Sequence, residues 1–253
     1  YNRKIFQDSY QYLMLWILLS FILSTDIYIN TLTTNTNCLD QTGCSINALT
    51  EYSEDTNGDV LHILGNIRDP NDTFQLMTWL STKSFSELTI IGSPSAVNFS
   101  FSGPNRINSL KLNESIITFD KINFIGHNSQ FLSITQTYLT ITNSIFSDLR
   151  IIEHEFMRIE DSSCSFNNVT FINPIICSSI CLFINSKVQF DEISLSKYNV
   201  KTSNAILFAF RKKCEVFIRH FHLRNSKLKH PVIQISDSIA DISNIFIGCS
   251  DSV

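Results

Sequence analysis

The second half of the chain carries a repeated pattern of hydrophobic and polar positions. A unit of the form apolar-x-apolar-x-x-apolar-x-apolar occurs six times between residues 117 and 247. The third residues of successive units are 22, 25, 24, 28 and 24 positions apart, and they are Phe119, Ile141, Phe166, Phe190, Ile218 and Ile242. Because alternate residues of a strand point to the same face, each unit predicts two short strands separated by a two-residue break.

A third apolar cluster follows each of the first five units. These clusters are Phe131 to Ile134, Phe156 to Ile159, Leu182 to Ile184, Leu207 to Phe210 and Val232 to Ile235. Three strands in a repeat of about 24 residues are typical of one coil of a parallel β-helix. The sequence therefore predicts an all-β fold, a right-handed parallel β-helix, in which equivalent positions of successive coils stack at ~4.8 Å.

The stacking predicts columns of inward-facing side chains. The first column is Ile117, Leu139, Cys164, Val188, Val216 and Ala240. The fourth column is Phe124, Phe146, Phe171, Leu195, Leu223 and Ile247. Ser144, in the third column, is the one polar residue among the four columns. We expect Phe166 and Phe171 to point inward and to contact their column neighbours.

The region before the repeat is less regular. Leu88 to Ile90 and Val97 to Phe101 predict an earlier coil, and Val60 to Leu64 predicts the start of another. Residues 70–82 predict a short helix or a loop that covers the end of the stack, because a first coil has unpaired strand edges. The predicted organisation is a signal segment over residues 1–25, a cap with an irregular first coil over 26–87, and β-helix coils over 88–253.

The competing fold is an antiparallel β-sandwich or propeller. Hairpins favour Asn-Gly and Asp-Gly turns, and the repeat region from Lys111 contains neither dipeptide. This observation favours the β-helix. The last unit begins at Ala240, and no third apolar cluster follows it. We therefore expect the 88–253 region to be truncated at its C-terminal end and the natural protein to continue with further coils or a cap.

The first 25 residues have the pattern of an export signal. Arg3 and Lys4 precede an apolar run of twelve residues, Tyr12 to Leu23, and Asp26 follows soon after. That length suits the core of a signal peptide and is short for a membrane helix, which needs about 20 residues. We interpret the segment as a signal peptide or an uncleaved signal anchor. The alternative is a buried helix of a cytosolic protein.

Sequons and cysteines support the prediction that the chain is exported from the cell. N-glycosylation sequons begin at Asn71, Asn98, Asn113 and Asn168. Seven cysteines are consistent with an oxidising compartment. Cys38 and Cys44 enclose a short segment with a turn-forming glycine, so we expect a disulfide between them. The pairing of the other cysteines is left open, and they are Cys164, Cys177, Cys181, Cys214 and Cys249.

Several segments together resemble a known group of proteins. They are the signal-like start, the Cys38–Cys44 segment, the Leu88-Thr-Ile-Ile-Gly92 lead-in and the Phe166-Asn-Asn-Val-Thr-Phe171 unit. These segments are similar to those of the pectin-lyase-like β-helix ectodomains of large surface proteins in ciliates and other protists. The resemblance covers roughly residues 38–253. It implies the fold and a surface location but little about activity, because its motifs are packing motifs.

The sequence predicts no catalytic residue, no cofactor and no metal site. Hydrolysis of a glycosidic bond needs paired carboxylates, and the predicted turn columns place no two carboxylates on adjacent coils. Glu153-His154-Glu155 is the most enzyme-like group, but an exposed rim is the favoured interpretation, since charged residues are mostly exposed. His220 and His222 could ligate a metal, but a zinc site normally takes three or four protein ligands.

Charge adds one further feature. The net charge of −4 gives no reason to expect nucleic acid as a partner. Basic residues gather, however, in the cluster Arg211, Lys212, Lys213, Arg219, Arg224, Lys227 and Lys229. Such a cluster can dock an anionic glycan or an acidic protein, or it can be the solvated rim of a coil. Stacking also predicts that Arg219 lies beside Asp191, and His220 beside Glu192.

These observations lead to one expected function and two alternatives. We expect a non-enzymatic module for surface architecture or adhesion, secreted or on the extracellular face of the plasma membrane. Its expected partners are glycans or other surface proteins, with membrane contact only through an uncleaved signal anchor or a C-terminal segment beyond this sequence. The first alternative is a carbohydrate-active enzyme, either a polysaccharide lyase or a glycoside hydrolase. The second is a spacer without a ligand.

Overall fold

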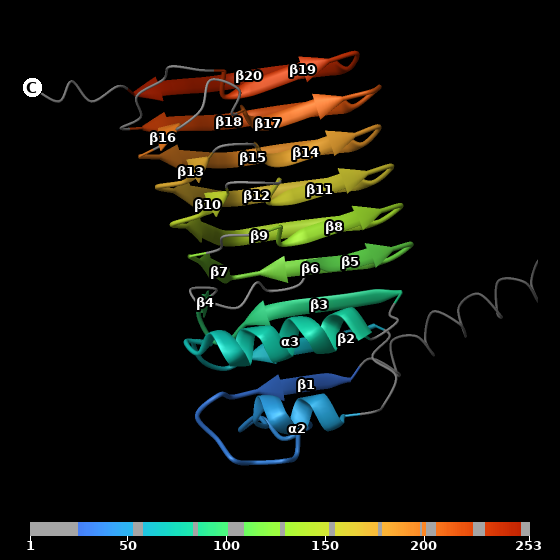
Figure 1. Ribbon diagram of the computed structural model, residues 1–253, viewed down its shortest axis with the longest axis vertical. Helices are drawn as coiled ribbons and strands as arrows, with labels where there is room; N and C mark the ends of the chain where they lie inside the picture. The colour runs from blue at the N-terminus through green and yellow to red at the C-terminus, as the bar shows by residue number, and fades with distance from the viewer. Residues whose placement is uncertain are drawn as a thin grey trace, which may run out of the picture.

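The chain forms a right-handed parallel β-helix in the computed structural model (Figure 1). The structure describes residues 25–52, 58–82, 86–100, 109–126, 130–151, 155–176, 179–197, 199–200, 206–224 and 231–248. The predicted signal segment lies outside these residues, apart from Thr25. In the described part of the chain, no helix is both long enough and apolar enough to cross a membrane.

Three parallel sheets run along the stack. The 11-stranded sheet follows the order β1 (Asp26–Ile29), β2 (Asp59–Ile63), β3 (Glu87–Gly92), β6 (Ile116–Asp120), β9 (Tyr138–Ser147), β12 (Ser163–Ile172), β15 (Lys187–Ser196), β18 (Glu215–Arg224) and β20 (Ile239–Gly248). The same sheet includes β4 (Val97–Ser100) and β7 (Ile122–Ile125). Because each strand pairs with the equivalent strand of the next coil, the sheet grows along the axis of the molecule.

The other two sheets close the coils. The six-stranded sheet contains β5 (Leu110–Asn113), β8 (Leu132–Thr135), β11 (Met157–Glu160), β14 (Ser179–Ile184), β17 (Ile206–Arg211) and β19 (Ile233–Ser236). The three-stranded sheet contains β10 (Arg150–Ile151), β13 (Ile175–Ile176) and β16 (Asn199–Val200). The third apolar cluster of each repeat forms the six-stranded sheet, as the sequence predicts.

The predicted break between two short strands is narrower than expected. In β9, β12, β15, β18 and β20 the eight residues of a unit and one residue on each side form one continuous strand of ten residues. Only the second break position leaves the ladder, with a left-handed φ of 50° at Asn143 and 52° at Asn168. The first position stays paired, as in Thr142↔Asn167, so a single residue bends each strand.

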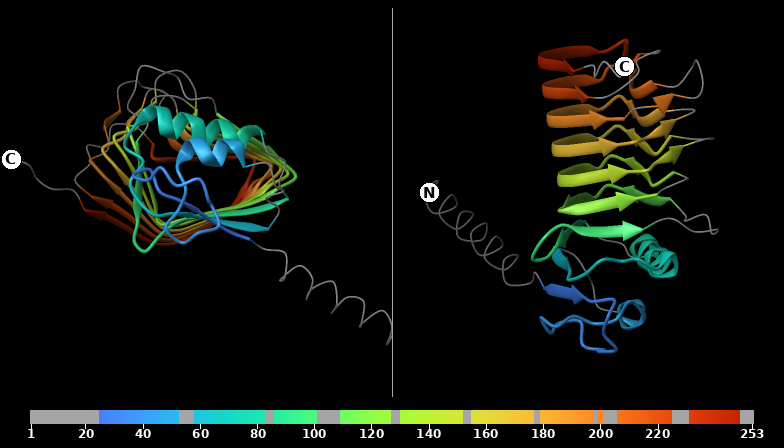
Figure 2. Two further views of the ribbon diagram at one scale, coloured as in Figure 1. Left: turned by 90° about the horizontal axis from the view of Figure 1, so that it is seen from below. Right: turned by 90° about the vertical axis from the view of Figure 1, so that its left-hand side faces the viewer.

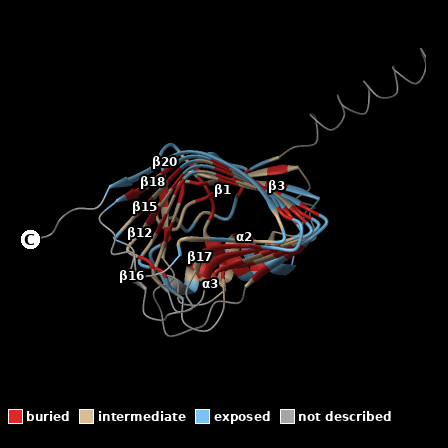
Figure 3. Cartoon of the chain, turned by 90° about the horizontal axis from the view of Figure 1, so that it is seen from above, coloured by how far each residue is buried: buried red, intermediate tan, exposed pale blue. Residues whose placement is uncertain are grey.

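The inward columns have the predicted register. Phe166 pairs with Ile141 on one side and with Phe190 on the other, and its side chain is buried. Phe171 pairs with Phe146 and stacks on its ring at 5.0 Å. The predicted inward position of both phenylalanines is therefore confirmed. Buried and more exposed residues alternate along the strands, as expected when alternate side chains point into the coil (Figure 3).

Two helices cover the N-terminal end of the stack. They are α2 (Ile46–Glu51) and α3 (Pro70–Thr82), which pack against each other (Figure 2). The predicted disulfide between Cys38 and Cys44 is present in the loop beside them, with a Cα–Cα distance of 4.6 Å. The parallel ladder already begins at Asp26, because β1 pairs with β2 and β2 with β3. The region expected to be a cap therefore also contributes strands to the main sheet.

Candidate functional site

Left-handed residues form rows at three corners of the coils. A residue with positive φ redirects the chain sharply, and Asn and Asp tolerate this conformation best. The first-corner row is Lys121, Asn143, Asn168, Glu192, His220 and Asn244. The second-corner row is Glu114, Gln136, Asp161, Asn185, Lys212, Lys213 and Asp237. The third-corner row is Gly126, Asp148, Asn173 and Lys197.

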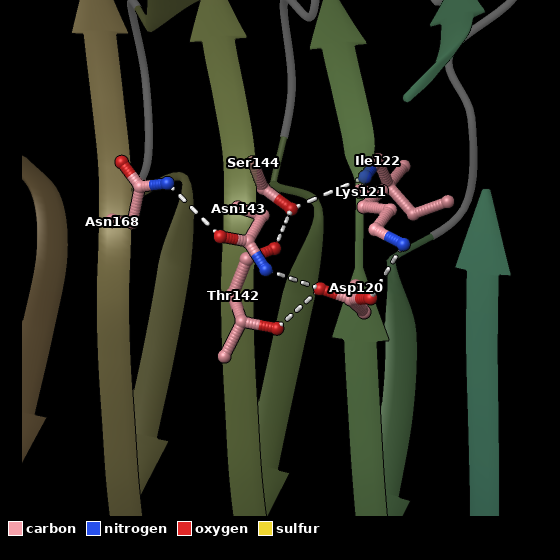
Figure 4. A network of polar contacts seen from close by, with 7 residues as sticks. All are labelled: Asp120, Lys121, Ile122, Thr142, Asn143, Ser144 and Asn168. Carbon is pink, nitrogen blue, oxygen red and sulfur yellow. Dashed lines mark hydrogen bonds and ion pairs between the residues drawn. The ribbon is translucent and has the colours of Figure 1, made fainter. Parts of the chain in front are cut away.

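Polar contacts join neighbouring coils at the first corner (Figure 4). The Asn168 Nδ2 group donates to Asn143 Oδ1 at 2.9 Å, and Asn143 Nδ2 donates to Asp120 Oδ1 at 2.8 Å. Thr142 Oγ1 donates to the same Asp120 oxygen at 2.7 Å. The Ser144 hydroxyl accepts from the Ile122 backbone N–H at 3.2 Å. Ser144 is thus the polar residue of an apolar column because its hydroxyl satisfies a buried backbone donor.

The first corner changes character toward the last coils. Arg219 lies beside Asp191 in the ladder, as predicted. His220 and Glu192 occupy equivalent corner positions, but the imidazole Nδ1 lies 3.0 Å from Asp191 Oδ1. The Asn244 amide donates to His220 Nε2 at 3.3 Å. These two contacts together are satisfied by a neutral imidazole that carries its hydrogen on Nδ1.

A column of buried hydroxyl groups accompanies the second corner. Its buried members are Ser115, Thr137, Ser162 and Ser186, and the half-buried Ser238 continues the column in the last described coil. The Ser162 Oγ accepts from the Thr137 N–H at 3.1 Å and donates to the Glu160 carbonyl at 2.6 Å. Ser186 does the same one coil further, accepting from the Ser162 N–H at 3.2 Å. The hydroxyls of Ser162, Ser186 and Ser238 therefore each satisfy two backbone groups at the turn.

The sequence analysis missed this hydroxyl column, although a signal for it exists. Each hydroxyl residue precedes the first inward apolar residue of its unit by two positions, as Ser162 precedes Cys164. In the coil of β18 the same position is Cys214, whose thiol contacts the Arg211 carbonyl at 3.2 Å. The column is therefore interrupted in that coil, next to an irregular corner.

That corner contains one residue more than its neighbours. Ile184 pairs with Arg211 and Lys187 with Glu215, so two residues of one coil stand opposite three of the next. At this corner two left-handed residues, Lys212 and Lys213, stand in place of one, and both have a φ of 58°. They lie at the edge of a hollow of about 730 Å³ that spans the coils from β11 to β19. Charged and amide side chains surround it, chiefly Arg158, Asp161, Asn185, Lys212, Lys213 and Asp237.

The predicted basic cluster is not gathered on one face. Its members lie at the second corner (Arg211, Lys212, Lys213), at the first corner (Arg219), at the end of β18 (Arg224) or outside the described residues (Lys227, Lys229). The cluster disperses because the ten residues of β18 carry the chain from one corner of the coil to another. Among the described members, Lys212 and Lys213 line the hollow at the second corner, and Arg224 lines a separate hollow of about 490 Å³ beside β20.

All four sequon asparagines lie in the described part of the chain. Asn71, Asn113 and Asn168 are exposed. Asn98 is half-buried, and its side-chain oxygen accepts a hydrogen bond of 2.9 Å from Asn123. The first three positions are therefore open to a bulky substituent, whereas Asn98 is more enclosed.

Three cysteines are free thiols in the core. They are Cys164, Cys181 and Cys214, and all three are buried. Burial raises the pKa of the Cys164 thiol, and the neighbouring Cys214 raises it further. Burial and then the neighbouring Cys164 raise the pKa of Cys181 well above its usual value. These thiols are packing groups rather than nucleophiles, because the thiolate is the reactive form. Cys177 and Cys249 lie outside the described residues.

A second polar hollow lies near the cap. It has a volume of about 370 Å³ and is lined by Thr31, Thr33, Thr34, Ser45, Asn47 and Asp72. Burial raises the pKa of the Asp72 carboxyl, and the charge of Asp69 adds to the effect. With a single carboxylate, this hollow lacks the pair of acids that glycoside hydrolysis requires.

The other groups considered from the sequence do not form a site among the described residues. No group of three or more His, Cys, Asp or Glu residues there could hold a metal ion. The His222 ring stacks on the exposed Phe246 ring at 4.9 Å, whereas His220 turns toward Asp191. Glu153 and His154 lie outside the described part of the chain. The hollow at the second corner is therefore taken as the candidate site, because it brings cations, carboxylates and an amide together.

Comparisons with known proteins identify no relative. No family model, no curated protein and no solved structure matches the chain. The arguments about function therefore depend on the geometry of the coils and their corners.

Proposed function

We propose that the chain is a non-enzymatic surface module that serves architecture or adhesion, secreted or displayed outside the cell. The observation that carries the proposal is the polar hollow at the second corner, which spans several coils of a stiff stack. Ladders of strand pairs and hydrogen-bonded corner side chains fix the backbone around it. Preorganised polar groups of this kind suit recognition of hydroxyl-rich molecules, because little side-chain freedom is lost on binding. The proposed partners are glycans or glycosylated surface proteins.

A glycan array probed with the purified chain tests this function. We expect binding to a restricted set of glycans that weakens as salt is added, because charged groups line the hollow. If the chain binds no glycan on the array and does not bind intact cells, the result would favour a spacer without a ligand.

A carbohydrate-active enzyme is the second candidate. It is favoured by the carboxylates Glu160, Asp161 and Asp237 around the same hollow, beside Arg158 and two lysines. Carboxylates and cations on adjacent coils can supply acids, bases and charge stabilisation. Incubation with acidic polysaccharides, followed by assays for unsaturated ends and for reducing ends, separates the two candidates. Turnover that disappears in an Asp161→Asn variant would replace the adhesion proposal.

The proposed location has its own test. In a eukaryotic secretory host, the chain should leave the cell and lose mass on endoglycosidase treatment. Replacing the exposed Asn113 by Gln should remove one glycan, whereas Asn66→Gln is a control outside any sequon. Intracellular retention with an unchanged mass would contradict export.

A further inference from the structure

The corner at Lys212 and Lys213 differs from the other described corners of its row. Elsewhere in the described part of that row, one left-handed residue turns the chain, as Asp161 does between β11 and β12 and Asn185 between β14 and β15. Lys212 and Lys213 are the only two consecutive residues in the described chain that both have positive φ. The next coil returns to a single residue, Asp237.

This conformation is unfavourable for lysine. A left-handed backbone brings the Cβ atom close to the following carbonyl, and lysine has no short side chain to compensate with a local hydrogen bond. Strained backbone of this kind persists where the surroundings hold it, and it is concentrated at ligand-binding sites. Lys121 and Lys197 turn ordinary corners in the same conformation, so the unusual feature here is the second left-handed lysine, which a regular corner does not need. We therefore attribute the extra lysine to its side chain rather than to folding.

The two ammonium groups are available to a ligand. Neither Lys212 nor Lys213 forms an ion pair or a side-chain hydrogen bond with any residue in the described part of the chain. The other cation of the hollow, Arg158, is engaged by Glu160, with Nε donating at 2.7 Å. The positive charge not already paired within the hollow therefore comes from the two lysines.

Hydrogen-bond acceptors flank the two lysines along the corner row, with Asp161 and Asn185 on the preceding coils and Asp237 on the next. The Asp161 Oδ1 atom accepts a hydrogen bond of 2.6 Å from Asn185 Nδ2. The other carboxylate oxygen of Asp161 and the side-chain oxygen of Asn185 can therefore accept from other donors. The Asp237 carboxylate is exposed and lines the same hollow. Ionised carboxylates only accept hydrogen bonds, whereas ammonium groups only donate them. A matching ligand therefore carries an anionic group for the lysines and hydroxyl groups on either side of it for the flanking acceptors.

Resting on the proposed adhesion function, we infer that this hollow binds a sugar unit that carries one anionic substituent. Lys212 and Lys213 hold the anionic group through charge-assisted hydrogen bonds, and Asp161, Asn185 and Asp237 accept from the sugar hydroxyls. A mainly apolar ligand does not fit, because Ile184 is the one apolar residue of the described lining. A sulfate ester and a uronate carboxylate both satisfy this chemistry.

The test compares matched polymers on the purified chain. Dextran sulfate, a polyuronate and unmodified dextran are titrated by calorimetry or by surface plasmon resonance. Polyglutamate serves as an anionic polymer without hydroxyl groups. We expect dextran sulfate or the polyuronate to bind, and unmodified dextran and polyglutamate to bind at least about tenfold more weakly, because each lacks half of the required contacts. The stronger of the two anionic sugars identifies the source of the anionic group.

Matched variants locate the site. The double variant Lys212→Gln, Lys213→Gln should weaken binding by about tenfold or more, since two charged hydrogen bonds are lost. The control is Lys121→Gln, Lys187→Gln, which removes the same charge away from the hollow and should change binding less than about threefold. Deleting Lys213 should restore a regular corner, leave the chain folded and weaken binding by less than the double variant does, because Lys212 keeps its charge.

The outcomes separate this inference from the broader function. If the wild-type chain binds an anionic sugar and the double variant binds it equally well, the hollow is not the site, although adhesion stands. If polyglutamate binds as tightly as the sugars, the contact is non-specific charge attraction and the inferred ligand is wrong. If no glycan binds to the wild-type chain, the adhesion proposal itself fails.

Discussion

The strands β12 and β20 carry the same pattern of residues but meet different surroundings. In β12, Phe166 and Phe171 are each 1% exposed, whereas in β20 the equivalent Ile242 and Ile247 are 40% and 60% exposed. Both strands have the same register and bend at a left-handed asparagine. The difference is that β12 has a paired strand on each side, while in the described chain β20 pairs with β18 alone. Register sets the direction of a side chain, and neighbouring coils set how far it is buried.

The two ends of the stack also differ in how well their inward side chains are covered. At the N-terminal end, α2 and α3 cover the first strands, and the inward residues Ile27 and Ile29 of β1 are fully buried (Figure 2). No described element lies over β20 in the same way. An inward apolar column therefore contributes its full stability only where something covers it, which makes substitutions along one column a direct measure of coil stacking.

The largest expected contrast is between two phenylalanines. Phe166→Ala should destabilise the fold by about 3–5 kcal/mol, because it empties a buried site between Ile141 and Phe190. Phe246→Ala should cost less than about 1 kcal/mol, since Phe246 is 54% exposed. Urea unfolding followed by circular dichroism measures both. Equal losses would show that the coils are not packed in this register.

A matched pair of isoleucines refines the comparison within one column. Ile218 is fully buried in β18, and Ile242 follows it in β20 at 40% exposure. We expect Ile218→Ala to cost about 2–4 kcal/mol and Ile242→Ala about 1 kcal/mol, because only the first leaves an enclosed cavity. The same urea titrations report the difference. A larger loss at Ile242 would mean that the last strand is covered in solution.

The hydroxyl column offers a smaller contrast. Ser162→Ala should cost about 1–3 kcal/mol, because the buried Thr137 N–H loses its acceptor. Ser238→Ala should cost less, since Ser238 is only half-buried and water can replace the hydroxyl. Ser162→Thr keeps the hydroxyl and serves as the control. A Ser162→Ala variant as stable as the wild type would remove the role assigned to the column.

The smallest effect at neutral pH concerns the buried thiols. Burial raises the folded-state pKa of Cys164 and Cys181, so stability is complete below the unfolded thiol pKa of about 8.5 and falls as the pH rises above it. At pH 9 each thiol should lower the free energy of unfolding by about 1 kcal/mol, because the thiol ionises in the unfolded chain but not in the folded one. Unfolding free energies between pH 7 and 9.5 test this. The variant Cys164→Ala, Cys181→Ala should give a flatter profile, and an unchanged slope would contradict the assignment.

The sequence predicted the core of this fold better than its surface. Inward columns such as Phe119 to Ile242 follow from alternation alone, because a strand shows every second residue to the same side. The sequence places the bend at Asn143 and Asn168 in the correct segment but predicts a break of two residues, whereas only one residue leaves the ladder. Alternation cannot show whether the residue before a turn keeps its ladder hydrogen bonds.

The candidate hollow could not be predicted from the sequence in the same way. The spacing of 28 between Phe190 and Ile218 signals extra residues, but not where they lie. The structure places one of them at Lys212–Lys213, and the others precede β17, since Ile184 and Arg211 are already 27 positions apart. Which charged side chains then share a hollow depends on contacts between residues separated by one or more whole coils.

The hydrogen bonds of the main sheet run along the axis of the molecule, from each strand to the next coil. Tension applied along that axis loads these bonds one coil at a time instead of shearing many together. Each coil adds only ~4.8 Å to the folded length, yet its 24 residues, counted from Phe166 to Phe190, extend to roughly 80 Å once released. Under mechanical load the stack should therefore lengthen in steps of one coil, each releasing between 22 and 28 residues, and absorb work while the remaining coils stay folded.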